Sequence, residues 1–564
     1  MRKLILFLFL AAMILLRTTH STDLLASSKN LTNGDKYILH ARMTETPPQL
    51  DGSLQDPVWS TVRPAGGFIQ KQPDEGRPAT EQTEVRVLYD RENLYIGVMC
   101  FDSDPDKIIA NIKRRDSKNI TENDHIKIML DTFKDRRSGI VFVTNPLGAR
   151  LDMQIRKEGI REGRNYMNNP NVNKDWNGLW QVQTAILSNG WAAEIVIPLC
   201  CLRYHEHPKE GWGINILRNI RRKNEESTWA PLSRSFDFNK ISMAGTLTGL
   251  DELEKGLRLQ IKPYVLANQV SRRNDAGELK HDLDFDGGLD IKIGLTANMT
   301  ADVTVNTDFS QVEADDQQIN LTRFDLFYPE KREFFLENAA IFNVGTSDDA
   351  MLFFSRRIGL TDDGQQIPLI GGVKVAGKAG KYNVGLINLQ TRAKNGTPSN
   401  NFTVARVSRD VLRNSAIGVL VTNRQSTESG DYNRSFTVDG DLVFSDNLSL
   451  GGYLAMTQTP GVDSGNKAGK IGFQWKSDNV DTYGYFIDIQ DHFNPEMGFM
   501  KRSGIRKSQI HLGYTPEPAI PGVRRLNPHM LVDYTTDQKN RLLLRETHLH
   551  LQVDFIKREI RCDL

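Results

Sequence analysis

The chain of 564 residues is poor in cysteine, with four in all, and their spacing makes no disulfide framework. Two of them, Cys200 and Cys201, stand close to His205 and His207, a combination that would suggest a metal site. The spacing matches no zinc-binding pattern. We therefore interpret this stretch as a loop with incidental histidines. His548 and His550 share one face of an expected strand, where polar residues facing a lumen are the simpler interpretation.

An excess of charge is also absent, because 71 Lys and Arg oppose 70 Asp and Glu, for a net charge of +1. This balance excludes a nucleic-acid binder held by bulk charge. Motifs of catalysis are missing as well: there is no G-x-S-x-G, H-E-x-x-H or P-loop. Carboxylates are abundant, but none stands in a recognisable glycosidase pair. The sequence favours a role other than catalysis.

Long apolar runs are confined to the N-terminus, where residues 4–16 follow Arg2 and Lys3. The run is shorter than the roughly 20 apolar residues of a transmembrane helix. Its basic, apolar and then polar order is typical of a secretory signal peptide, which we place at residues 1–21. An N-terminal membrane anchor is the alternative. No later segment is long and apolar enough to predict a transmembrane helix.

The most informative feature that the chain does have is strict alternation of apolar and polar residues at 289–305. Leu289, Ile291 and Ile293 alternate with polar residues, and after a short turn the pattern resumes from Met299 to Val305. Side chains of a strand point to opposite faces with a period of two, so this run predicts a hairpin with one apolar and one polar face.

Similar arms recur through residues 251–564, at a spacing compatible with membrane-spanning strands of about 9–11 residues. Together with the export signal they predict an antiparallel outer-membrane β-barrel. A soluble β-propeller is the alternative, but no blade-length repeat is present. The charged end of the chain, 557–564, is unsuited to a lipid-facing closing strand. We therefore expect a barrel truncated at its C-terminus, in which the strand before Ile556 does not pair with the strand at Leu257.

The preceding residues, 35–250, have a different pattern of strands and turns. Short strands with frequent turn signals predict a β-sandwich, and six of the seven tryptophans lie here.

Inside the expected barrel, residues 307–343 break the alternation with dense acidic and aromatic side chains. An ionised side chain facing lipid at mid-bilayer costs about 2–4 kcal/mol. This segment therefore belongs in the lumen or in water, either constricting a pore or folded as a long loop.

Several stretches of the N-terminal part resemble the family 9 carbohydrate-binding module: LDGSLQDPVW (50–59), LDTFKDRR (130–137), NPLG (145–148), WAAEIVIP (191–198) and WGIN (212–215). The later stretches DFSQVEAD (308–315), FYPEKREFFLE (327–337) and HFNPEMGF (492–499) resemble a family of bacterial outer-membrane proteins of unknown function. Members of that family join such a module to a C-terminal barrel. The resemblance covers nearly the whole chain after the signal.

The resemblance to carbohydrate-binding modules implies that a sugar stacks between tryptophan faces and that calcium ions brace loops. Trp176, Trp180 and Trp229 are the candidates for stacking, with Trp229 first. Trp59, Trp191 and Trp212 lie within strand or opening motifs and are expected in the core.

The expected function is carbohydrate binding, and glycan uptake, by an outer-membrane barrel protein, with carbohydrate and outer-membrane lipid as partners. One alternative is a secreted polysaccharide-processing hydrolase. Another is a structural or assembly protein whose module binds an envelope protein.

Overall fold

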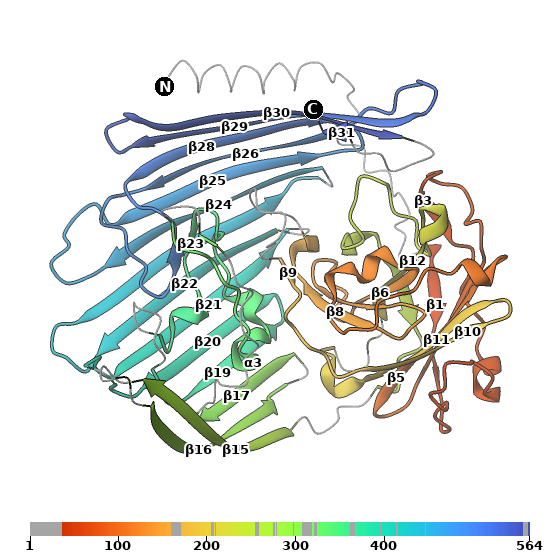
Figure 1. Ribbon diagram of the computed structural model, residues 1–564, viewed down its shortest axis with the longest axis horizontal. Helices are drawn as coiled ribbons and strands as arrows, with labels where there is room; N and C mark the ends of the chain where they lie inside the picture. Colours follow the sequence, from red (N-terminus) through yellow and green to blue (C-terminus); the bar gives the residue numbers. More distant parts are fainter. Residues whose placement is uncertain are drawn as a thin grey trace.

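The computed structural model describes residues 36–563, with gaps at 160–170, 205–207, 209, 254–258, 274–276, 278, 297, 307–318, 321–323, 361–366, 395, 413–414, 446 and 556–561. The predicted all-β class is confirmed: a two-sheet sandwich lies beside a large antiparallel sheet that curls like a barrel wall (Figure 1). The proposed signal peptide lies outside the described residues. Among the described residues, no helix is long and apolar enough to span a bilayer.

The sandwich is built from two sheets. The first has nine strands: β1 (Ile38–His40), β14 (Gly245–Thr248), β12 (Trp212–Ile220), β6 (His125–Asp131), β7 (Gly139–Thr144), β8 (Arg150–Ile155) and β9 (Val172–Asn173) in spatial order, with β13 (Glu225–Thr228) and β3 (Ile69–Gln72) branching from β12. The second has five: β10 (Gln181–Leu187), β11 (Gly190–Pro198), β5 (Asn93–Phe101), β4 (Thr83–Tyr89) and β2 (Arg42–Met43). Short 3-10 turns link them: η1 (Pro57–Thr61), η2 (Pro105–Lys107), η3 (Lys118–Glu122), η4 (Lys157–Gly159), η5 (Leu199–Cys201), η6 (Arg221–Lys223) and η7 (Ile241–Met243).

Between the two sheets lies a continuous apolar core. Val87 and Ile96 from one sheet and Ile128 and Trp212 from the other are almost completely buried. Such burial of β-branched and aromatic side chains is what a pleated sheet with one inward face requires.

The large sheet has fifteen antiparallel strands in chain order: β15 (Leu259–Arg273), β16 (Leu279–Gly294), β17 (Met299–Val305), β19 (Leu369–Ala379), β20 (Tyr382–Thr391), β21 (Asn400–Val411), β22 (Ser415–Ser426), β23 (Tyr432–Val443), β24 (Leu448–Gln458), β25 (Lys467–Lys476), β26 (Val480–Ile489), β28 (Ile505–Tyr514), β29 (Val523–Asp537), β30 (Leu542–Phe555) and β31 (Cys562–Asp563). The predicted hairpin is confirmed, since Leu289 of β16 pairs with Val305 of β17.

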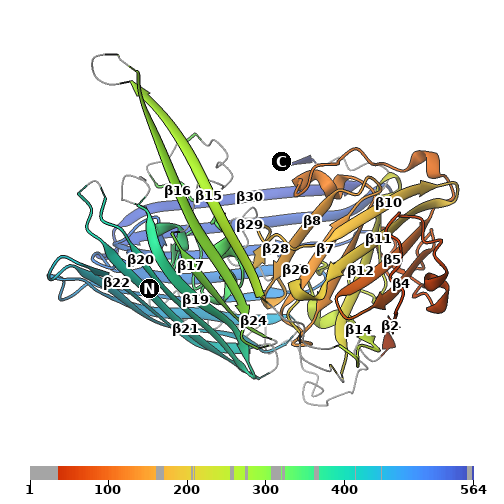
Figure 2. The same cartoon turned by 90° about the horizontal axis from the view of Figure 1, so that it is seen from below.

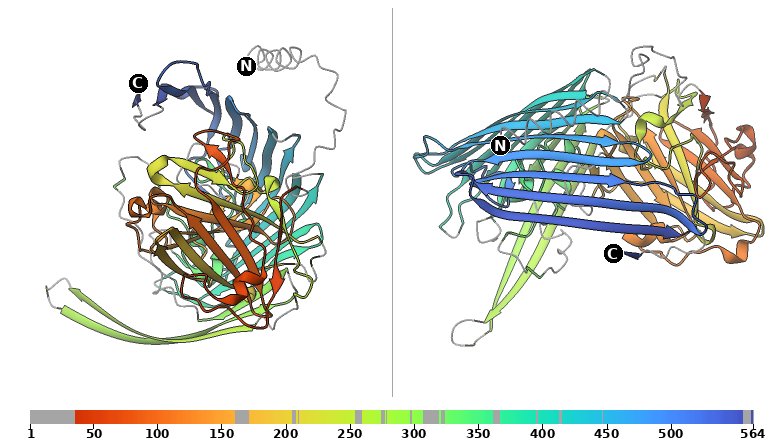
Figure 3. Two further views of the ribbon diagram at one scale, coloured as in Figure 1. Left: turned by 90° about the vertical axis from the view of Figure 1, so that its right-hand side faces the viewer. Right: turned by 90° about the horizontal axis from the view of Figure 1, so that it is seen from above.

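The two edges of this sheet lie apart. The long β15–β16 hairpin projects away from the other strands (Figure 2), and β30 and β31 lie at the opposite margin (Figure 3). Among the described residues, β15 pairs with β16 alone, and β30 pairs with β29 and β31. As expected, the ladders of the described residues include no pairing between β15 and β30.

The segment between β17 and β19 packs against the concave face of the large sheet (Figure 1). It contains the single-turn helix α3 (Glu333–Leu336), the turns η8 (Ala339–Ile341) and η9 (Ser355–Arg357), and β18 (Ala350–Met351), which pairs with β27 (Phe499–Met500). We call residues 324–358 the plug segment.

Candidate functional site

The large sheet has two chemically different faces. Val438 is 59% exposed and Leu454 is 73% exposed on the convex face. Their neighbours in the same strands, Thr437 and Thr457, point the other way and are 1% exposed. The strand period of two therefore places apolar side chains outside and hydroxyls inside.

Aromatic side chains mark one margin of the convex face. Tyr382, Trp475 and Tyr514 stand at the strand ends nearest the sandwich, and each is exposed by more than two-fifths. Trp and Tyr combine an apolar body with a polar tip, which suits the boundary between water and an apolar phase.

The plug segment is attached to the inner face by apolar packing. Phe335, Phe342 and Leu352 of the plug segment are buried in one cluster with Leu389 and Ile487 of the wall. The part of the predicted acidic and aromatic segment at 324–343 therefore packs on the concave face of the large sheet, and its position in the lumen of a barrel stays a prediction. Residues 307–318 and 321–323 of that prediction lie outside the described residues.

Ion pairs hold the plug segment as well. Glu337 accepts contacts from Lys292 of the wall and from Arg203 of the sandwich. Elsewhere on the concave face of the large sheet, Asp349 lies 3.2 Å from Lys470 and 3.0 Å from Lys507. Because these partners are buried or nearly so, the plug segment cannot leave without exposing unpaired charges.

The sandwich covers the end of the large sheet where the strand connections are short. Arg137 lies 2.8 Å from Asp410, and Lys378 lies 3.0 Å from both Asp410 and Asp135. Burial opposes ionisation of Asp135, but attraction from Lys378 outweighs it and lowers the pKa of this carboxyl. These four groups, which we call the docking network, alternate in charge across the boundary.

Further contacts extend the same boundary. Lys157 lies 2.5 Å from Asp441, and the hydroxyls of Ser233 and Ser235 donate to Asp478 at 2.9 and 2.8 Å. The sandwich is thus joined to several consecutive strand connections rather than to one.

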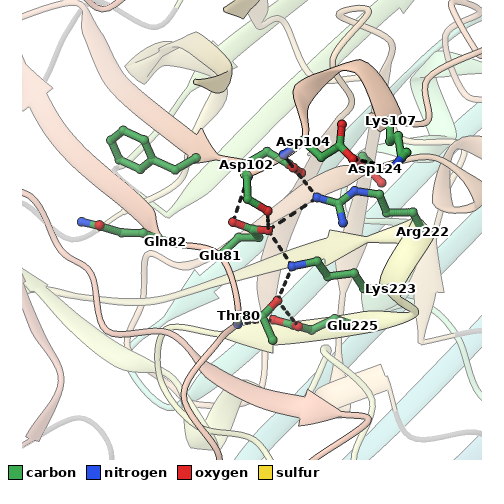
Figure 4. Close-up of polar contacts among 12 residues, drawn as sticks. Thr80, Glu81, Gln82, Asp102, Asp104, Lys107, Asp124, Arg222, Lys223 and Glu225 are labelled. Carbon is green, nitrogen blue, oxygen red and sulfur yellow. Dashed lines mark hydrogen bonds and ion pairs between the residues drawn. The ribbon is translucent and has the colours of Figure 1, made fainter. Parts of the chain in front are cut away.

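A charged cluster occupies another edge of the sandwich, where β4 begins and β5 and β12 end (Figure 4). Lys223 Nζ lies 2.5 Å from Glu81, and Arg222 contacts Asp102. Burial opposes ionisation of Glu81, but hydrogen bonding to Lys223 outweighs it and lowers the pKa of Glu81 to about 2.

The sequence resemblance implies calcium at loops of this kind, and this cluster does not fit it. Calcium takes six to eight oxygen ligands, whereas the carboxylates of Glu81 and Asp102 already contact cationic side chains. Over the described part of the chain, no group of three or more His, Cys, Asp or Glu side chains is placed to hold a metal ion. Cys200 and Cys201 lie side by side, while His205 and His207 lie outside the described residues.

The three tryptophans proposed to stack on a sugar lie in the sandwich core. Trp176, Trp180 and Trp229 are 8%, 2% and 4% exposed. Trp180 packs edge-on against Phe142 and donates from Nε1 to Asp152 at 3.0 Å. Trp229 packs edge-on against Tyr37. The stacking role stays a prediction, and these positions offer a ligand little open aromatic surface.

The tryptophans expected in the core are there. Trp59 is 2% exposed and donates to Glu194 at 2.8 Å, and Trp191 and Trp212 are also buried. The docking network and the plug contacts were missed by sequence reasoning, because pairs such as Arg137 and Asp410 carry no local pattern.

Comparison with known proteins adds a family match and several structural neighbours. Residues 255–433 match a model described as a domain of unknown function (DUF5916). No curated protein matches the chain. A putative carbohydrate-binding protein from Bacteroides uniformis is 11% identical and covers 37% of this chain and 97% of its own, with a TM-score of 0.29.

Two further structures align with a larger part of the chain. OccK3 from Pseudomonas aeruginosa is 8% identical and covers 77% of this chain and 96% of its own, with a TM-score of 0.28. OccAB3 from Acinetobacter baumannii is 9% identical and covers 76% and 96%, with a TM-score of 0.25.

Proposed function

We propose that this chain is an outer-membrane barrel protein that binds carbohydrate and takes part in its uptake. In this proposal the convex face of the large sheet meets lipid, the plug segment closes the lumen and the sandwich covers the periplasmic mouth. The observation that carries it is the two-faced sheet, with exposed Leu454 and Val438 outside and buried Thr437 and Thr457 inside. An outward apolar face around a polar interior is the arrangement of transmembrane barrels.

The lengths of the strand connections support the orientation. At the sandwich end most connections are short, as at residues 380–381, 444–447 and 477–479, and the connection 515–522 is an exception. At the other end they are longer, as at 459–466 and 490–504. Outer-membrane barrels have short periplasmic turns and longer extracellular loops, so the sandwich belongs on the periplasmic side.

Carbohydrate enters the proposal through the sandwich, whose motifs resemble a carbohydrate-binding module. The part of the sandwich that faces the barrel is joined to it by the docking network. A glycan held at this junction would stand at the mouth of the lumen, where uptake begins or ends.

The test is expression of the full chain with its leader in a Gram-negative host. We expect the protein in the outer-membrane fraction, with faster gel migration before boiling than after, and binding to members of a glycan array in detergent. A protein recovered from the soluble periplasm without a migration shift would refute the barrel. A folded, membrane-inserted protein that binds no glycan would refute the carbohydrate part alone.

A further inference from the structure

A cavity of about 150 Å³ lies where the sandwich, the plug segment and the wall meet. Arg137, Arg156 and Lys157 line it from the sandwich, Asn343 from the plug segment, and Tyr453 from β24. A space of this size holds a single six-membered ring. It is the place where one ligand would touch all three parts of the protein.

The charges around the cavity are nearly all paired. Three of its lining cations have carboxylate partners: Arg137 with Asp410 at 2.8 Å, Lys157 with Asp441 at 2.5 Å and Lys470 with Asp349 at 3.2 Å. Two of its lining carboxylates are likewise neutralised: Asp439 by Arg406 at 2.5 Å and Glu158 by Lys240 at 2.7 Å.

Arg156 is the exception. Among the described residues its guanidinium makes no direct ion pair or hydrogen bond, although it lines the cavity. Burial, and then the neighbouring Arg406 and Arg137, lower the pKa of Arg156 to about 10, against the weaker attraction of Asp441 and Asp410. The group is therefore still cationic at neutral pH. Burying a cation beside other cations is costly unless an anion joins them.

The other lining groups suit a hydroxylated ring. Asn171, Asn343 and Gln474 bring amides to the cavity, and Tyr453 and Tyr485 bring aromatic rings. The hydroxyl of Tyr453 is buried without a partner among the described residues. Amides hydrogen-bond to ring hydroxyls, and a guanidinium binds a carboxylate through two parallel hydrogen bonds.

We propose that this cavity binds an acidic sugar, with the carboxylate of one uronic-acid ring on Arg156 and the ring hydroxyls among the amides. The proposal rests on the proposed function, because it names the class of carbohydrate that the junction takes. The bound ring would contact the sandwich, the plug segment and the wall together. Its binding would therefore stabilise the arrangement in which all three parts are assembled.

The test is calorimetric titration of the full chain in detergent micelles with glucuronate, glucose and acetate. We expect glucuronate to bind at least tenfold more tightly than either glucose, which lacks the charge, or acetate, which lacks the ring. Arg156→Gln should weaken glucuronate binding at least tenfold, and Arg156→Lys should retain part of it. Arg91→Gln is the matched control, because Arg91 is an exposed arginine of the same sandwich.

Folding is checked by the thermal unfolding midpoint, which Arg156→Gln should leave unchanged or raise, because the variant removes a partly buried charge that has no direct ion pair. Equal binding of glucuronate and glucose, or of glucuronate to wild type and Arg156→Gln, would overturn the acidic-sugar site while leaving carbohydrate binding in place. Binding of acetate as tight as glucuronate would also overturn it, by showing an anion site without sugar selectivity. If the chain binds no glycan at all, the result refutes the carbohydrate binding of the proposed function, and with it the acidic-sugar site.

Discussion

At the scale of single residues, burial sets the role of the sandwich tryptophans. Trp229 is 4% exposed and packs against Tyr37. Gly245 lies so close to the Trp229 ring that a Cβ atom added to this glycine would be 2.6 Å from the ring. Such close packing places the Trp229 side chain in the core of the sandwich.

We expect Trp229→Ala to destabilise the sandwich by about 3–5 kcal/mol, because truncating a buried aromatic leaves a cavity. Near-ultraviolet circular dichroism and protease resistance of the full chain measure the effect. Trp475→Ala is a control, since Trp475 is 42% exposed on the outer face of β25. A Trp229→Ala protein with an intact sandwich but no glycan binding would instead establish the stacking role.

Glu81 links stability to pH. Its pKa in the folded protein, about 2, lies below the ordinary value of 4.5. The stabilising contribution of this carboxylate is therefore complete above pH 4.5 and is lost as pH falls from there towards about 2.

We expect Glu81→Gln to lower the free energy of unfolding at pH 7 by about 1.5–3 kcal/mol, because hydrogen bonds to charged groups are lost. The same variant should lose less stability than wild type between pH 4.5 and 2. Denaturant titration at several pH values measures both effects. Glu84→Gln is a suitable comparison, because Glu84 is paired with Arg86 on the same strand in a more exposed position. Parallel pH profiles for wild type and Glu81→Gln would contradict the assignment.

At the scale of elements, the plug segment is held by contacts that its own sequence does not contain. Glu337 follows α3 directly and contacts Lys292 of the wall and Arg203 of the sandwich. Glu333, in the first turn of the same helix, is mostly exposed and pairs with Lys262 at 2.5 Å. The two carboxylates lie four residues apart but differ in what their ion pairs contribute to stability. The exposed pair of Glu333 contributes only about 0–1 kcal/mol.

We expect Glu337→Gln to loosen the plug segment and raise ion conductance of the protein in planar lipid bilayers. Glu333→Gln should leave the conductance unchanged. Hydrogen exchange at residues 333–342 gives a second measurement that does not depend on channel opening. Equal conductance and equal exchange in the two variants would contradict the role of Glu337 in holding the plug segment.

At the scale of the whole molecule, the sandwich and the large sheet are joined by charge. Asp410 pairs with both Arg137 and Lys378, so its loss removes the carboxylate partner of Arg137 and leaves Lys378 with Asp135 alone. Partly buried pairs of this kind are screened less by salt than exposed ones, but they still weaken as ionic strength rises.

We expect Asp410→Asn to release the sandwich from the sheet, with faster proteolysis between the two parts and a larger effect in high salt. Asp463→Asn, in an exposed connection at the opposite end of the strands, is the control. An unchanged proteolysis pattern for Asp410→Asn at every salt concentration would show that apolar contacts alone hold the two parts together.

Much of the fold was readable from local pattern. The hairpin at 289–305, the turn between β4 and β5, and the end of β11 at Pro198 all follow from alternation and turn residues within a few positions. The packing of residues 324–343 on the concave face of the large sheet was not readable in this way, because dense charge excludes lipid but does not choose between lumen and water.

The candidate site was not readable in the same way. Calcium, which the resemblance implies, does not fit the charged cluster, because cationic side chains already contact the carboxylates of Glu81 and Asp102. The sequence shows that Trp176, Trp180 and Trp229 are aromatic, but it does not show whether their rings are exposed. Their exposure depends on neighbours such as Phe142 and Tyr37, which only the fold brings close.

The all-β class and the two-faced strands follow from local pattern alone, because side-chain direction alternates along any extended chain regardless of what surrounds it. Which charges meet depends on the folded arrangement. Arg137 contacts Asp410 across 273 positions of the chain, while Arg156 makes no direct ion pair among the described residues. Pairing across such distances depends on where the strands carry each side chain, so the unpaired guanidinium at the junction became visible only in the folded protein.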